Sequence, residues 1–207
     1  MSRTLLAAIV LTLTAAPLQA QKAPPFEASL KQLHVDVMRT HAEQVQARVR
    51  AVSGDIGRLD REVGAMVSEA WRLERELWDL RRRAERIDER DRRNNDPFFR
   101  NDLRRLVWDL RGLERDADRA KTDVERASRE AKKDPALVGP AQELLRSAQS
   151  FGTRARRLAS EANWASMDIR RAGYSFEAFD IERHARDILR SANGIEDEAG
   201  RLLDKVR

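Results

Sequence analysis

Histidine and methionine come nearest to a chemical site in this 207-residue chain, which has 3 His, 4 Met and no Cys. His34, Met38 and His41 are spaced four and three residues apart, so they share one face of a helix. Imidazole nitrogen and thioether sulfur are ligands that copper accepts. Two histidines are fewer ligands than a zinc site usually has, and Met38 also belongs to the apolar repeat described below. We therefore expect no bound metal and no cofactor.

Catalytic motifs are not found elsewhere in the chain. There is no Gly-x-Ser-x-Gly elbow, no His-Glu-x-x-His pair and no glycine-rich phosphate loop. The lack of cysteine excludes a thiol nucleophile, a cysteine-ligated metal and a disulfide framework. Acidic pairs are so abundant that no single pair is informative. The sequence predicts a protein that is not an enzyme.

Tryptophan is the first candidate for binding other proteins. All four tryptophans fall on helix faces turned away from the apolar repeat: Trp71, Trp78, Trp108 and Trp164. One interpretation is a second apolar face packed against another helix. The other is an exposed aromatic stripe for a partner helix or an unfolded client, because tryptophan is enriched at binding hot spots. Arg75 and Arg82 follow one turn after the first two and are placed to cover the indole rings.

Arginine is the second candidate, as an anion-binding surface. Residues 135–172 hold 6 basic and 3 acidic side chains. The candidate residues are Arg154, Arg156, Arg157, Arg170 and Arg171. A paired, solvated helix face is the alternative interpretation. Charges of both signs alternate along most of the chain, so we do not expect a nucleic-acid partner. An anionic envelope surface or polymer would be the ligand.

The first twenty residues resemble an export signal. Arg3 is their only charge, an apolar run extends from Leu5 to Pro17, and Leu18-Gln19-Ala20 ends on a small residue. An uncleaved membrane anchor is the alternative, but the run is short for a bilayer. No second apolar stretch follows, so no transmembrane segment is expected after removal of the signal. Arg outnumbers Lys 34 to 6, a bias common in GC-rich bacteria. We expect an exported bacterial protein, periplasmic or secreted.

Prolines mark where helices begin. None occurs between Phe26 and Asp96 or after Pro140, and proline costs a helix interior about 3 kcal/mol. Asp96-Pro97 and Asp134-Pro135 each place a capping carboxylate before a proline that can start a helix. A linker over 21–26 is expected to precede one helical domain over 27–207. Its predicted helices cover about 27–93, 97–132, 140–172 and 176–206.

An apolar repeat of three and four residues runs through all four stretches. It extends from Val35 to Ile87, Phe99 to Ala131, Leu137 to Ala172 and Ala178 to Val206. We call these positions the seam. A sustained seven-residue repeat means helices wound on one another. The fold class is therefore all-α, an extended antiparallel helical bundle or coiled coil of four helices.

The first helix is too long for its partners, at about 100 Å against about 50 Å for each of the others. It can remain continuous, with its C-terminal half in the bundle and its N-terminal half projecting. It can instead fold back at Ser53-Gly54-Asp55, giving five helices. The seam continues through Val52, Ile56 and Leu59, which favours a continuous or gently bent helix.

The sequence indicates only the general class of function. The exported, basic, cysteine-free and helical form is similar to small periplasmic chaperones with helical arms, but no motif supports this likeness, so no functional residue is carried over. The main hypothesis is a non-enzymatic coiled-coil scaffold that acts through protein–protein contacts, including self-association. One alternative is a periplasmic holdase-type chaperone that uses the four tryptophans. The other is a binder of an anionic envelope surface or polymer.

Overall fold

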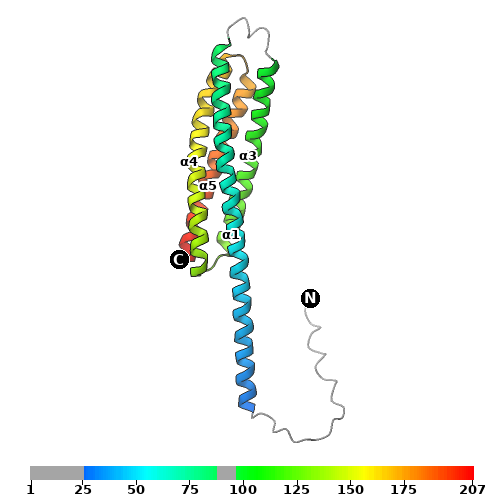
Figure 1. Ribbon diagram of the computed structural model, residues 1–207, viewed down its shortest axis with the longest axis vertical. Coiled ribbons are helices and arrows are strands. Elements are labelled where there is room, and N and C mark those ends of the chain that lie inside the picture. Colours follow the sequence, from blue (N-terminus) through cyan, green and yellow to red (C-terminus); the bar gives the residue numbers. More distant parts are fainter. Residues whose placement is uncertain (1–25, 88–96) are drawn as a thin grey trace, which may run out of the picture. The chain divides into compact units, whose positions relative to one another are not determined.

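The computed structural model describes residues 26–87 and 97–207 (Figure 1). The expected signal peptide and most of the linker lie outside the described residues. The chain divides into two compact units, residues 1–44 and 45–207, and each is described on its own.

Four α-helices make up nearly all of the described chain: α1 (Phe26–Arg86), α3 (Pro97–Glu130), α4 (Pro135–Arg171) and α5 (Ser175–Val206). The prediction of an all-α helical bundle is confirmed for this part of the chain. None of these helices contains a stretch long and apolar enough to cross a membrane.

Helix α1 continues through Gly54 without a break. The described residues therefore form four helices rather than five, and the alternative that folds back at Ser53-Gly54-Asp55 is wrong. A glycine costs a helix only about 1 kcal/mol. Burial of the seam side chains Ile56 and Leu59 just beyond it outweighs that cost.

Helix α4 begins at Pro135, five residues before the predicted start. The carboxylate of Asp134 accepts a hydrogen bond from the backbone N–H of Ala136 at 2.8 Å, and Pro135 takes the first helical position. Pro140 lies inside the helix. Its missing N–H removes one helix hydrogen bond near the N-terminus, and the cap holds the turn that precedes it.

The end of α4 is closed by a glycine in the left-handed region. Gly173 has φ of 96°, and its N–H donates to the carbonyl of Arg170 at 3.0 Å. The N–H of Tyr174 donates to the carbonyl of Ile169 at 3.1 Å, which completes a Schellman motif. The buried Tyr174 ring then meets the ring of Phe99 edge-on, 5.2 Å between centroids. This contact attaches the α4–α5 turn to the start of α3.

The seam forms the core of the second unit. In α3, α4 and α5 every residue predicted for the seam is buried, and in α1 burial extends from Ile56 to Ala84. The first seam residues of α1 differ. Every described side chain from Lys31 to Arg48 is exposed, including those of Val35, Met38 and Ala42. Seam residues are buried only where other helices of the chain pack against them.

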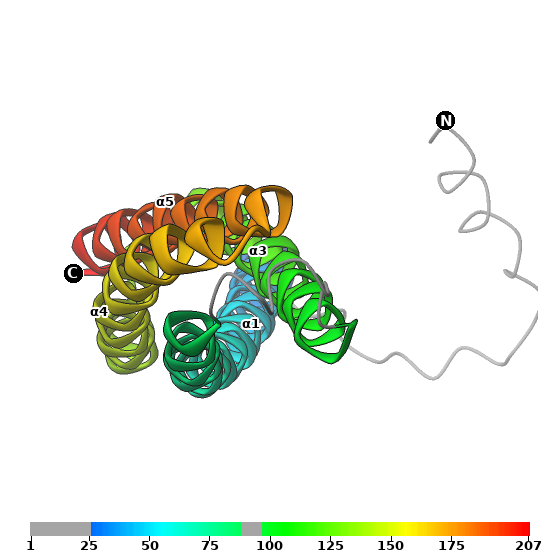
Figure 2. The ribbon, with the colours of Figure 1, turned by 90° about the horizontal axis from the view of Figure 1, so that it is seen from above.

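In the second unit, each helix has two neighbours. Helix α5 contacts both α3 and α4, and α1 pairs with the same two helices from the opposite side (Figure 2). Successive helices alternate in direction, as predicted. Because α3 and α4 occupy opposite corners, the neighbours α1 and α4 are parallel, and so are α3 and α5.

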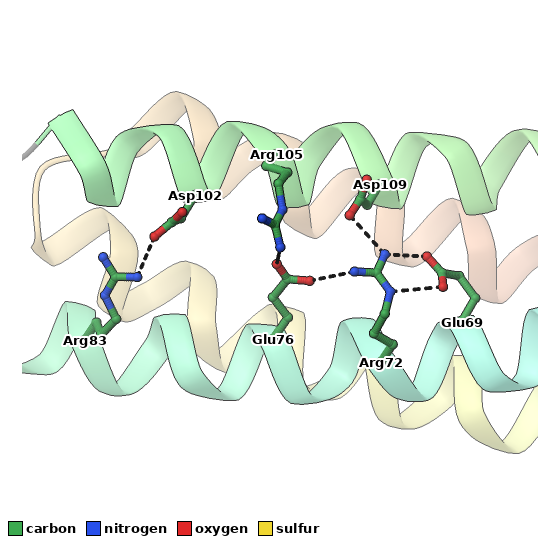
Figure 3. Close-up of polar contacts among 7 residues, drawn as sticks. All are labelled: Glu69, Arg72, Glu76, Arg83, Asp102, Arg105 and Asp109. Carbon is green, nitrogen blue, oxygen red and sulfur yellow. Dashed lines mark hydrogen bonds and ion pairs between the residues drawn. The ribbon is translucent and has the colours of Figure 1, made fainter.

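The α1–α3 contact is a ladder of ion pairs between antiparallel helices (Figure 3). At one end of the ladder the Arg72 guanidinium contacts Glu69, Glu76 and Asp109, the last at 2.9 Å. Hydrogen bonds to Glu69 and then Asp109 raise the pKa of Arg72 above its usual value. Two further pairs extend the ladder, Arg105–Glu76 at 3.1 Å and Arg83–Asp102 at 2.6 Å.

The parallel contacts are also marked by polar pairs. Between α1 and α4, Ser147 donates to Asp60 at 2.6 Å and Arg81 to Asp168 at 3.1 Å. The pairs that join α3 and α5 include Arg100–Glu177, His184–Glu114 and Ser191–Asp118. Within each set, a later residue of one helix pairs with a later residue of the other. This order shows that the two helices run parallel.

The short connection from α3 to α4 passes over the end of α5. The N–H of Asp134 donates to the carbonyl of Val206 at 3.2 Å. The ammonium of Lys205 donates to the carbonyls of Ser128 and Arg129 at 2.7 and 2.8 Å. These bonds satisfy carbonyl groups that the last turn of α3 leaves free. They also hold the connection in the diagonal position that makes α3 and α5 neighbours.

Replacing Gly54 by alanine tests the continuity of α1. No atom lies within 4 Å of the added Cβ. We expect Gly54→Ala to raise the free energy of unfolding by about 0.5–1 kcal/mol, since helical glycine pays the larger entropy cost. Urea unfolding followed by circular dichroism measures the change.

The matched control is Gly173→Ala, where φ of 96° strains any side chain. This variant is expected to lose about 1–2 kcal/mol. A neutral or destabilising Gly54→Ala would contradict a continuous helix at this position.

Candidate protein-binding surfaces

The four tryptophans lie on the surface of the bundle. The exposed fractions of their side chains are 45% for Trp71, 45% for Trp78, 51% for Trp164 and 65% for Trp108. The sequence left two interpretations open, a second packed face or an exposed stripe. The exposed fractions fit an exposed stripe, because the bundle covers only about half of each indole.

Two of these tryptophans line one groove between α1 and α4. Trp71 and Trp78 are two turns apart on α1, and with Glu74, Arg75, Asp79 and Glu161 they line a hollow of about 200 Å³. Trp164 of α4 lies beside it, with its ring 6.0 Å from the guanidinium of Arg81. We call this surface the tryptophan groove. Trp108 lies apart from it, on α3.

Arginines cover part of each indole in the groove. The guanidinium of Arg75 is 4.9 Å from the centroid of Trp71, and that of Arg82 is 3.8 Å from Trp78. Both placements are as predicted. At exposed sites such contacts contribute about 0.5–1 kcal/mol. Even with these contacts, Trp71 and Trp78 each remain 45% exposed.

The floor of the groove is charged but internally balanced. One carboxylate oxygen of Glu74 and one of Glu161 are closed to solvent and accept no hydrogen bond from the described residues. They lie 3.5 Å from Arg154 and 3.6 Å from Arg81. Burial lowers the pKa of Arg81, but a hydrogen bond to Asp168 and the charge of Glu161 outweigh it and raise the pKa overall. These two buried carboxylates are therefore balanced, whereas Asp79 in the same lining is exposed and has no ion pair among the described residues.

A second hollow, of about 560 Å³, lies between α1 and α3. Its polar lining consists of ionised side chains: Arg58, Glu62, Glu69, Asp116, Arg119 and Asp123. Neither this hollow nor the tryptophan groove is lined by serine, threonine or histidine. The lining of both hollows therefore lacks the pairing of a hydroxyl nucleophile with a histidine base.

The arginine candidates on α4 are mostly paired. Arg154 contacts Glu74, Arg156 contacts Glu196 at 3.3 Å, Arg170 contacts Glu182, and Arg171 contacts Asp168. Arg157 alone of the five has no ion pair among the described residues. Such pairing is what a solvated helix face predicts, and it leaves little unbalanced positive charge for an anion.

The histidines do not gather into a metal site. His34 and His41 are exposed on the first unit, and no group of three potential metal-binding His, Cys, Asp or Glu side chains occurs among the described residues. His184 is buried, and its Nδ1 contacts the carboxylate of Glu114. It packs between α3 and α5.

The first unit carries exposed apolar side chains on two sides of its helix. Val35 and Met38 are 56% and 59% exposed, and with the exposed Ala42 they form what we call the free seam. Val45, the first residue of the second unit, follows in the same register and is 45% exposed. Leu33 and Val37, 60% and 58% exposed, lie outside the repeat. The sequence reasoning missed these two because it followed only the seam.

Comparisons with known proteins found no match among family models, curated proteins or solved structures. The function proposed below therefore depends on the residues of this chain alone.

Tryptophan fluorescence tests the exposure of the indoles. Variants that keep one tryptophan and replace the other three by phenylalanine should emit at long wavelength and be quenched by acrylamide in the folded state. Quenching should be strongest in the variant that keeps Trp108, the most exposed of the four. A blue-shifted emission that resists quenching until urea unfolds the protein would contradict the surface placement.

Proposed function

We propose that the protein is a non-enzymatic, exported helical scaffold that acts through protein–protein contacts. The free seam carries this proposal: Val35, Met38 and Ala42 continue a seven-residue repeat, yet the described chain leaves them exposed. Apolar seam side chains of this kind are stable in water when another helix covers them. A helix segment whose apolar repeat continues past the buried part of the bundle is suited to bind a second helix.

The segment from residue 31 to residue 48 has few features that stabilise an isolated helix. Between residues 31 and 48 only five of eighteen side chains are charged, against fifteen of twenty-nine between 58 and 86. Arg39–Glu43 at 3.2 Å is its single ion pair among the described residues. Isolated helices of this length are marginal in water, and β-branched residues such as Val35 and Val37 weaken them further. A partner helix would supply the missing stabilisation.

Export is a separate part of the proposal, supported by the sequence of residues 1–20. A short apolar run after one arginine, ending on a small residue, is typical of a secretory signal. A fold without cysteine depends on packing alone, so an oxidising compartment neither helps nor harms it. The periplasm or the extracellular space is the proposed location.

Photocrosslinking tests the contact function. A photoreactive phenylalanine analogue at Met38 should form covalent adducts with protein in an envelope extract of the bacterium that makes this chain. The control places the analogue at Arg119, whose side chain is 79% exposed on α3. Few adducts are expected there. Equal yields at the two positions, or none at either, would reject contact through the free seam.

A holdase-type chaperone is the second candidate, and the tryptophan groove favours it. Two half-exposed indoles line the groove and a third lies near it, each contacted by an arginine, which gives a surface suited to apolar segments of an unfolded client. Glu74 and Glu161 are already balanced by Arg154 and Arg81, so of the groove's carboxylates only Asp79 would present an unpaired charge to a client.

Client protection tests this candidate. The protein should slow light scattering by a heat-denatured model enzyme, and the double variant Trp71→Ala/Trp78→Ala should lose most of that effect. Trp108→Ala should retain it, because Trp108 is exposed but lies outside the groove. If the unaltered protein gives no protection, or all three proteins protect equally, the groove does not bind clients.

A further inference from the structure

We infer that the free seam takes a second copy of this chain, and that the two α1 helices pair in parallel and in register. This inference rests on the proposed function and names its partner. Three observations carry it: the seam is not covered, its register continues into an established interface, and its flanking charges allow self-pairing.

The register is the first support. In the lettering of a seven-residue repeat, Val35 and Ala42 take position a and Met38 and Val45 take position d. The same positions further along α1, from Ile56 to Ala84, are the ones buried in the bundle. The free seam is therefore the same stripe that already packs against helices of this chain. A stripe that packs against other helices of its own chain is also suited in shape to pack against an identical helix.

The charges beside the seam are the second support. In a parallel pair, each g position faces the next e position of the partner helix. The resulting pairs are His34 with Arg39, His41 with Gln46 and Arg48 with Ser53. None places two carboxylates, or two side chains of the Arg and Lys kind, opposite each other. The acidic residues Asp36 and Glu43 are at outer positions, and Glu43 is held by Arg39.

The next heptad sets a natural limit to the pairing. Continued in register, it would place Asp55 opposite Asp60 of the other copy, and like charges at these positions repel. The seam residues of that heptad, Ile56 and Leu59, are already buried in the bundle. Charge and burial therefore agree that the paired region ends before residue 55.

Leu33 and Val37 provide a matched control. They are as exposed as Val35 and Met38 and equally apolar. They take positions f and c, which point away from the partner in a two-helix pair. Replacing Leu33 and Val37 changes the same kind of surface by a similar amount, so only the register distinguishes the two double variants.

Sedimentation of the purified chain lacking residues 1–20, which keeps every described residue, is the test. We expect a dimer at tens of micromolar. Val35→Gln/Met38→Gln should weaken association by about a hundredfold or more, because four apolar side chains per dimer lose their burial. Leu33→Gln/Val37→Gln should change it only a few fold. Urea unfolding at concentrations low enough to keep all three monomeric should show the same bundle stability, since these side chains are exposed in the single chain.

A single cysteine tests the alignment, because the chain has none of its own. Ala42→Cys should form an intermolecular disulfide under mild oxidation, since position a faces position a in a parallel pair. Thr40→Cys, at an outer position, should not. Failure of Ala42→Cys in a protein that dimerises would overturn the parallel, in-register arrangement.

The outcomes separate this inference from the function that it rests on. A strictly monomeric protein overturns self-pairing, and so does association that both double variants weaken equally. If the monomer still crosslinks from Met38 to another envelope protein, the scaffold function stands with a different partner. If the protein is monomeric and Met38 crosslinks to nothing, both fail.

Discussion

Burial of one apolar stripe per helix is the constraint on which this structure depends. The chain has no cysteine, so neither a disulfide nor a cysteine-ligated metal can hold the fold. The stripe is rich in alanine in α4 and α5, and small residues bury little area each. Each of these helices therefore needs two neighbours, which the four-cornered arrangement provides. Where α1 has no neighbour from its own chain, its stripe is left open to other proteins.

Polar contacts decide which helices become neighbours. The seams of all four helices are apolar, and apolar burial is non-directional, so burial alone specifies weakly which helices occupy neighbouring corners. The ladder around Arg72 joins α1 to α3, and Glu114 with His184 joins α3 to α5. At the far end, Lys205 and Asp134 hold the diagonal connection over α5. Individually weak, these contacts together select one topology.

The seven-residue repeat predicted the features of the fold that depend on the spacing of apolar residues. Helix existence, the buried side of α3, α4 and α5, and the continuity of α1 through Gly54 all follow from spacing. The predicted start of α4 is five residues late, because Pro140 is compatible with a helix start and only the Asp134 cap shows that the helix begins at Pro135. The parallel pairing of α1 with α4 and of α3 with α5 could not be predicted from the repeat, because it depends on side-chain pairs between segments far apart in the sequence. The exposure of the tryptophans was equally undecided, because an off-seam position fits a packed face and an open one alike.

The diagonal connection has a consequence for the order of folding. The pairs that join α1 to α3 and α4 to α5 span 12 to 40 residues, whereas those that join the parallel neighbours span 70 to 87. Closing a longer loop costs more entropy and is slower. The bundle is thus two helical hairpins, each able to form from local contacts, whose docking against each other is the late step. Hydrogen exchange would then show two cooperative units rather than one.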